Sequence, residues 1–292
     1  MWLYGVPAIF VVLWSAGFTF AKMGLDETSP FVLLSLRYAL VVLVLFPAFI
    51  AVRPPLPASR TAFAHVAVVG VLIQVGFFGG TYVAIAHGAS AGTVGLLFVL
   101  QPILVSLFAP KMTGDRVTAG AWAGLCLGLL GAALVVIARS GVQTLPVFGL
   151  ASSVFGVVAM AGATLYERRF GVSQHVVTAN LIQCGVGLLI VVPLALGLEG
   201  FHVSWSAKLG MALAYLVLAN SLVSITLLLA MVRRGEASRV SALFFLVPPT
   251  AAIVAWMLVG EIMPPLGWLG MLCAGAGVAI VRRLPGAPRM QS

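Results

Sequence analysis

The sequence predicts an all-α membrane protein of ten transmembrane helices, arranged as two five-helix halves. Three observations support this prediction: an apolar composition, ten apolar runs of membrane-spanning length, and an internal repeat. Hydrophobic residues make up 62% of the 292-residue chain and charged residues only 8%, and the mean hydropathy is +1.16. A soluble domain carries about 25% charged residues to solvate its surface. Most of this surface is therefore expected to face lipid.

Each of the ten runs has roughly the 20 apolar residues that a helix needs to cross the hydrocarbon core. The first half contains runs 3–22, 31–51, 63–86, 90–109 and 118–138, and the second half contains 147–167, 176–197, 208–231, 236–259 and 265–283. The connections between them are short. The segment Arg53–Arg60, which joins the second and third runs, holds three prolines and is typical of a loop.

The basic residues predict the orientation of these helices, because cytoplasmic loops of membrane proteins are enriched in Lys and Arg. With a cytoplasmic N-terminus, twelve basic residues fall inside, three (Lys22, Arg139, Lys208) fall outside, and Arg37 stays within a span. Both termini are then cytoplasmic. The net charge of +9 does not indicate nucleic-acid binding, since the basic residues lie at the ends of apolar runs.

The two halves, 1–146 and 147–292, align without gaps at an offset of 146 residues. Identical pairs at this offset are Pro47/Pro193, Phe98/Phe244, Pro102/Pro248, Trp122/Trp268, Gly124/Gly270 and Gly131/Gly277, and Gln74 is paired with Asn220. Because each half has an odd number of helices, the second half enters the membrane from the opposite side. Inverted repeats of this kind are typical of carriers that expose a central site alternately to each side. A duplication kept only as a stable scaffold is the alternative.

Several stretches, in order along the chain, resemble the drug/metabolite transporter superfamily, specifically its ten-helix EamA-type members. They are Leu13–Phe18 with Lys22–Gly24, Leu36–Tyr38, Ser90–Gly92 with Gln101–Pro102, and Gly260–Glu261 with Gly267, Gly270 and Gly277. The resemblance implies a basket in which spans 1, 3, 4, 6, 8 and 9 surround a cavity and spans 5 and 10 lie further out. Family members export or exchange amino acids and other small metabolites. Overall likeness favours the branch of aromatic amino-acid exporters, although Met160 stands where the repeat would place a second Trp14.

Polar and aromatic residues inside these spans are candidates for the cavity wall, because polar groups in a bilayer need partners or water. We expect nine residues to line the cavity: Trp14, Gln74, Phe78, Tyr82, Gln101, Met160, Asn220, Ser224 and Phe244. The amides of Gln74 and Asn220 suit a zwitterionic solute, and helix–helix hydrogen bonding is their alternative role. An aromatic stripe that faces lipid is the alternative for Phe78 and Tyr82. Pro102 and Pro248 are expected to kink equivalent helices and to act as hinges.

Arg37 is the one strongly ionised group well inside a predicted span, about 10 Å from the outer end by helix rise. We expect a structural role for it, as a bridge between helices or by snorkelling to the interface. Pairing with a solute carboxylate is the alternative.

The sequence therefore predicts a secondary transporter of small metabolites, favouring aromatic or other hydrophobic amino acids, in the inner membrane. Its partners are a small-molecule substrate and the bilayer, with no nucleic acid, and a monomer is plausible. An organic-phosphate or sugar exchanger is the runner-up, but it would need several cavity Lys or Arg. A membrane-embedded enzyme would need a catalytic cluster, and none is visible, so no catalytic residue, metal or cofactor is expected. Because no Asp or Glu lies in the middle of a span, we expect a facilitator or exchanger.

Overall fold

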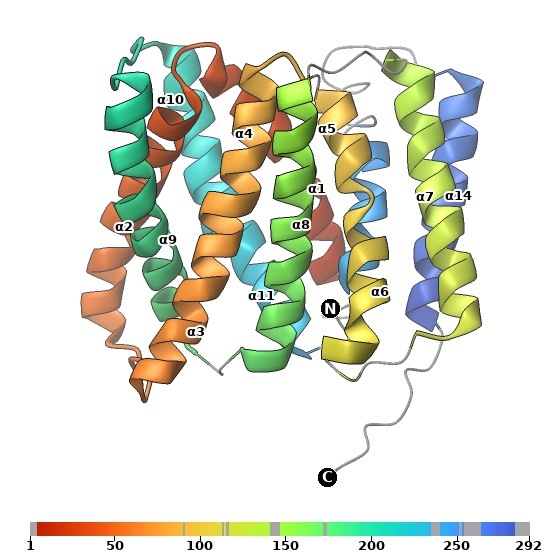
Figure 1. Ribbon diagram of the computed structural model, residues 1–292, viewed down its shortest axis with the longest axis horizontal. Helices are drawn as coiled ribbons and strands as arrows, with labels where there is room; N and C mark the ends of the chain where they lie inside the picture. Colours follow the sequence, from red (N-terminus) through yellow and green to blue (C-terminus); the bar gives the residue numbers. More distant parts are fainter. Residues whose placement is uncertain are drawn as a thin grey trace.

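The computed structural model describes residues 5–89, 91–112, 114, 117–140, 147–171, 174–234, 240–250, 253 and 264–283. Within them the chain is helical apart from turns, loops and an isolated antiparallel bridge between Thr28 and Val203. The helices lie side by side and run roughly parallel to a common direction (Figure 1).

The elements follow the chain order of the predicted spans. The first half contains α1 (Gly5–Leu25), α2 (Pro30–Val52), a rod of α3 (Arg60–Gly70), η1 (Val71–Phe77) and α4 (Phe78–Ala86), then α5 (Ala91–Phe98), α6 (Gln101–Met112) and α7 (Ala119–Ser140). The second half contains α8 (Val147–Phe170), α9 (Val176–Leu194) with η2 (Ala195–Glu199), a rod of α10 (Ala207–Tyr215), η3 (Leu216–Ser224) and α11 (Ile225–Arg234), then η4 (Ala242–Leu246) and α14 (Pro265–Arg283).

The lengths and surfaces of these helices are those of a multi-pass membrane protein. Six described helices are long and apolar enough to cross a bilayer, and α7 and α14 carry shorter apolar stretches. Large apolar side chains face outward along them; Leu43, Leu189 and Leu272 are 67%, 75% and 72% exposed. A water-soluble monomer rarely exposes so much contiguous apolar surface, so these faces contact lipid.

The predicted fourth span is two helices, not one continuous helix. Helix α5 ends at Phe98, Val99 and Leu100 form a turn, and α6 begins at Gln101. Pro102 therefore lies in the first turn of a new helix, where its missing N–H costs no hydrogen bond. Pro248 occupies a similar place, because the 3₁₀ segment η4 gives way to α-helix at Val247. In the predicted ninth span, residues 236–239, 251–252 and 254–259 lie outside the described residues.

The third helix of each half is widened into a π-helix near its middle. These segments, η1 and η3, lie at nearly the same position of the 146-residue repeat and contain Gln74 and Asn220 respectively. π-segments leave backbone groups without regular helical partners. Here Tyr38 Oη donates to the Gln74 carbonyl (2.6 Å) and Asn180 Nδ2 donates to the Ser221 carbonyl (2.8 Å).

Helices α7 and α14 pack against each other through glycines, at the right-hand side of Figure 1. A Cβ on Gly124 would lie 2.9 Å from the Gly277 carbonyl oxygen, and one on Gly270 would lie 2.7 Å from the Gly131 carbonyl oxygen. The 146-residue offset converts the first contact into the second, so both helices use the same surface. Absent side chains let two membrane helices approach this closely.

Replacing Gly131 with alanine is expected to lower thermal stability. The new Cβ would lie 2.2 Å from the Ala274 amide nitrogen, and only a shift of the α14 backbone relieves such a clash. Overpacking of this kind costs about 1–3 kcal/mol. The control is Gly275→Ala on α14, where no neighbouring atom lies within 4 Å of the new Cβ. Thermal unfolding of the purified protein in detergent measures both, and equal melting temperatures would contradict the prediction.

Candidate functional site

The candidate site is a small pocket that joins helix α1 to the middle of both widened rods. Its wall consists of Trp14, Gly17, Phe18, Ala21, Phe77, Phe78, Thr81, Tyr82 and Asn220. We call it the central pocket. Its volume is about 10 Å³, roughly the room that one water molecule requires. A solute larger than water must therefore displace side chains to bind here.

The buried guanidinium of Arg37 contacts residues of the pocket wall, although Arg37 does not itself line the pocket. Arg37 is 0% exposed, and it donates from Nε to Ser221 Oγ (2.8 Å), from Nη1 to Tyr82 Oη (2.9 Å) and from Nη2 to Asn220 Oδ1 (2.7 Å). Its Cζ also lies 4.0 Å from the centre of the Phe78 ring. The side chain bridges helices and does not snorkel. Three of the groups that hold it, Phe78, Tyr82 and Asn220, belong to the pocket wall.

Close approach of α1 makes this arrangement possible. A Cβ on Gly17 would lie 2.6 Å from Asn220 Nδ2, so only glycine leaves room for the amide between α1 and η3. The close packing of α1 against η3 brings residues of both halves of the chain into one wall.

The pocket wall also includes part of a cluster of aromatic rings around Trp14. The rings of Phe10, Phe77, Phe78, Phe98 and Phe244 all lie within 6.3 Å of the Trp14 ring, measured between centroids. These six residues, here called the aromatic cluster, come from α1, η1, α4, α5 and η4. Each of them is at most 5% exposed. Aromatic rings of this kind have flat apolar faces that pack well against an apolar group of a solute.

Four of the nine predicted cavity residues line the central pocket: Trp14, Phe78, Tyr82 and Asn220. Phe244 belongs to the aromatic cluster behind them. Thr81, which the spacing places on the helix face of Phe78 and Tyr82, also lines the pocket, and the prediction did not include the other wall residues Gly17, Phe18, Ala21 and Phe77.

The remaining four predicted residues are buried elsewhere in the helix bundle. Gln101 Nε2 donates to Thr164 Oγ1 (3.2 Å) and Ser241 Oγ (3.3 Å), and the hydroxyl of Thr164 in turn donates to the Met160 carbonyl. Gln74 and Ser224 are 0% exposed, and their side-chain polar atoms have no hydrogen-bond partner among the described residues. Gln74 packs on α9, because a Cβ on Gly187 would lie 2.8 Å from its Cβ.

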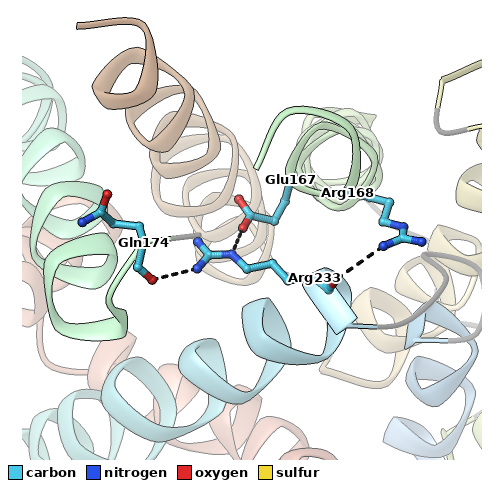
Figure 2. A network of polar contacts seen from close by, with 4 residues as sticks. All are labelled: Glu167, Arg168, Gln174 and Arg233. Carbon is cyan, nitrogen blue, oxygen red and sulfur yellow. Dashed lines mark hydrogen bonds and ion pairs between the residues drawn. The ribbon is translucent and has the colours of Figure 1, made fainter. Parts of the chain in front are cut away.

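A polar network closes the end of the bundle where α8 and α11 finish. Arg233 Nε donates to the Glu167 carboxylate, and Arg233 Nη1 donates to the Gln174 carbonyl (3.0 Å). Figure 2 shows the Arg233 guanidinium between these two groups, with Arg168 donating to the Arg233 carbonyl. We call Glu167, Gln174 and Arg233 the Glu167 clasp. Sequence reasoning placed Glu167 at a span end and gave it no role; its one signal was an acid in a chain with only seven Asp and Glu.

A second acidic residue closes the opposite end of the bundle. The Glu199 carboxylate accepts from Ser29 Oγ (2.6 Å) and from the backbone N–H groups of Phe31 and Val32 at the start of α2. It thereby neutralises unpaired N–H groups and the positive end of the α2 dipole. The exposed pair Asp26–Lys208 lies in the neighbouring loops. The Glu199 end of the bundle is thus held by contacts between the first and second halves. The Glu167 end is held by contacts within the second half.

The described residues contain no group of three His, Cys, Asp or Glu side chains placed to hold a metal ion. What the central pocket offers instead is a hydroxyl, a phenol and an amide beside aromatic faces. That chemistry suits binding of a small amphipathic solute.

Comparison with known proteins gives the same class. The model of the EamA-like transporter family matches residues 3–137 and again residues 147–283. A probable amino-acid metabolite efflux pump of Salmonella typhimurium is 25% identical over 284 residues, covering 93% of this chain and 92% of its own. A probable terminal-alkyne amino-acid exporter of Streptantibioticus cattleyicolor is 27% identical over 278 residues, covering 94% of this chain and 91% of its own.

A solved crystal structure shares the fold, with a TM-score of 0.78 at 17% identity over 94% of this chain and 95% of that one. The resemblance to EamA-type transporters that the sequence motifs indicated is thus confirmed, and so is the prediction of a transporter and not an enzyme. Since the family model covers most of both halves, the chain belongs to the EamA-like transporter family and is a multi-pass membrane protein.

Proposed function

We propose that this protein exports amino acids or closely related metabolites across the inner membrane by alternating access to the central pocket. The observation that carries the proposal is the pocket wall itself: Trp14 and Tyr82 come from the first half, and Asn220 comes from the second. A site between two halves can open to either side when the halves rock against each other. Relatives whose names specify amino-acid efflux or export support the substrate class.

The proposed mechanism uses ten transmembrane helices in two inverted halves, 1–146 and 147–292. Three observations support this arrangement: the family model matches twice, the π-segments recur at equivalent positions, and the glycine contacts of α7 and α14 obey the same offset. Helix α1 begins and helix α14 ends at the lower side of Figure 1, where α8 also ends. The ends of α8 and α11 are rich in arginine, which supports a cytoplasmic location of both termini.

The central pocket has room for about one water molecule, and the Glu167 clasp and Glu199 lie at opposite ends of the bundle. We infer that export requires the two ends to open one at a time. The runner-up substrate, an organic phosphate, is disfavoured because Arg37 is the only described Lys or Arg that contacts the wall and Lys22 is exposed.

Flux in proteoliposomes tests the proposal. Reconstituted protein is expected to exchange internal radiolabelled amino acids for external unlabelled ones without a pH or sodium gradient. Sugar phosphates serve as the comparison panel. Transport of sugar phosphates alone would overturn the substrate class, and strict dependence on an imposed proton gradient would overturn the exchanger mechanism.

Replacing Trp14 with leucine is expected to reduce this exchange about ten-fold or more, which corresponds to about 1.4 kcal/mol of lost interaction. Leucine removes the indole that touches all five other rings of the aromatic cluster and forms part of the pocket wall. Trp205→Leu is the matched control, because Trp205 is 75% exposed in the loop before α10. Exchange rates that fall equally in both variants would remove Trp14 from the site.

A further inference from the structure

Arg37 is a buried cation with no acidic partner among the residues that the structure describes. It is 0% exposed, and its three hydrogen bonds all go to neutral oxygen atoms. Of the four acids that the structure describes, Glu167 pairs with Arg233, Glu199 caps α2, Asp26 pairs with Lys208, and Glu27 follows Asp26 in the same loop. None contacts Arg37. An uncompensated charge at this depth is costly, so the site is poised to accept an anion.

The guanidinium hydrogen bonds to two residues of the pocket wall and does not use all of its donors. It has five N–H groups, and three of them donate to described residues. Two of the three acceptors, Tyr82 Oη and Asn220 Oδ1, are pocket-wall groups that a carboxylate could replace. The displaced phenol and amide are both donors and could then bind the same carboxylate. Arginine binds carboxylates through two parallel hydrogen bonds, a geometry that the two Nη atoms provide.

The position equivalent to Arg37 in the other half of the protein carries no charge, and its side-chain polar atoms have no hydrogen-bond partner among the described residues. The 146-residue offset pairs Arg37 with Gln183. Gln183 lies on α9 against the rod of the first half, since a Cβ on Gly70 would lie 2.8 Å from its Cα, and it is 0% exposed. A neutral amide therefore occupies the equivalent helix crossing. The charge on one side only favours a role in binding over a role in packing.

We propose that Arg37 binds the carboxylate of the exported solute, so that the carboxylate and not the amino group is the recognised feature. This inference rests on the proposed function and narrows its substrate class to small carboxylates with an apolar body. The apolar body would lie against Trp14 and Phe77. The pocket wall contains no Asp or Glu that would pair with an ammonium group.

Competition for exchange of radiolabelled L-phenylalanine tests the inference on the unaltered protein. The competitors are unlabelled L-phenylalanine, 3-phenylpropanoate, which lacks the amino group, and L-phenylalaninamide, which lacks the carboxylate. The first two are expected to inhibit exchange at similar concentrations, and the amide at least about ten-fold more weakly. Equal inhibition by the amide, or none by 3-phenylpropanoate, would overturn the inference and leave the transport proposal standing. No exchange of phenylalanine, leucine or methionine would overturn the proposed function itself.

Two variants assign the preference to Arg37. Arg37→Gln, which installs the residue found at the equivalent position, is expected to lose ligand-induced thermal stabilisation by 3-phenylpropanoate, whereas Arg37→Lys keeps part of it. Thermal shift needs no transport activity, and ligand-free melting curves report whether each variant folds. If Arg37→Gln does not fold, the Arg37→Lys shift decides: it is expected to be smaller than that of the unaltered protein. An unchanged shift in any folded variant would overturn the assignment.

Discussion

Asn220→Asp is expected to raise the melting temperature of the protein and to reduce amino-acid exchange by at least about ten-fold. The Asn220 oxygen already accepts from Arg37 Nη2 at 2.7 Å. Aspartate has nearly the same shape, so it would place a permanent carboxylate against a buried cation that has no described acid partner. The charge-assisted bond is about twice as strong as the neutral one. The same carboxylate would occupy the place proposed for the solute.

Asn180→Asp is the matched control, because it makes the same chemical change at a similarly buried site, 3% exposed. Asn180 Nδ2 donates to the Ser221 carbonyl, so aspartate there sets two acceptors against each other and is expected to destabilise. Melting curves and exchange rates are measured for both variants. An Asn220→Asp protein that exchanges normally would exclude the Arg37 guanidinium from solute binding.

Glu167→Gln is expected to be the most destabilising single change at the ends of the bundle. It removes the carboxylate that accepts from Arg233 Nε, and the Glu167 side chain is only 2% exposed. Removal of one partner from a buried ion pair leaves the other charge unpaired and costs about 3–5 kcal/mol. Because Arg233 is 19% exposed, water can solvate it in part, so the lower end of that range is expected.

The double variant Glu167→Gln/Arg233→Gln distinguishes the cost of losing the ion pair from the cost of leaving the Arg233 charge without its acidic partner. It removes both charges and is expected to recover most of the stability that Glu167→Gln loses. Arg169→Gln is the control for a lost charge at the same end, since its guanidinium is exposed and donates to the Met112 carbonyl. Thermal unfolding measures all four proteins. A double variant no more stable than Glu167→Gln would mean that Arg233 finds other partners.

Much of the fold could be predicted because each membrane helix requires a continuous apolar run in the sequence. An apolar run such as 31–51 has to be a helix, since lipid offers no partners for an unfolded backbone. The described helix Pro30–Val52 differs from this range by a single residue at each end. For the fourth span the sequence predicted a kink at Pro102 but not a full break at Val99 and Leu100, because hydropathy stays high through these residues. Only the proline that follows, Pro102, hinted at a new helix.

The site was harder to predict than the spans. Trp14, Phe78, Tyr82 and Asn220 were placed on a cavity wall and do line the central pocket, but Gln74 and Asn220, an equivalent pair in the repeat, have different surroundings. Periodicity assigns a residue to a helix face and does not say which neighbour that face meets. The Glu167–Arg233 pair joins residues 66 positions apart and leaves no periodic signal.

Composition and repeat thus determine a great deal here: a chain that must lie in lipid, spans of known length, and two related halves. They do so because solvation by lipid acts on each segment separately, so the apolar residues of a segment are enough to identify it as a span. The role of Arg37 could not be determined from the sequence in this way. The same arginine in the same helix would snorkel, bridge helices or bind a solute according to what lies beside it. Tertiary packing placed Ser221, Tyr82 and Asn220 around it and left no described acid within reach. The role of a buried charge depends on the residues that folding places around it, and those residues are distant in sequence.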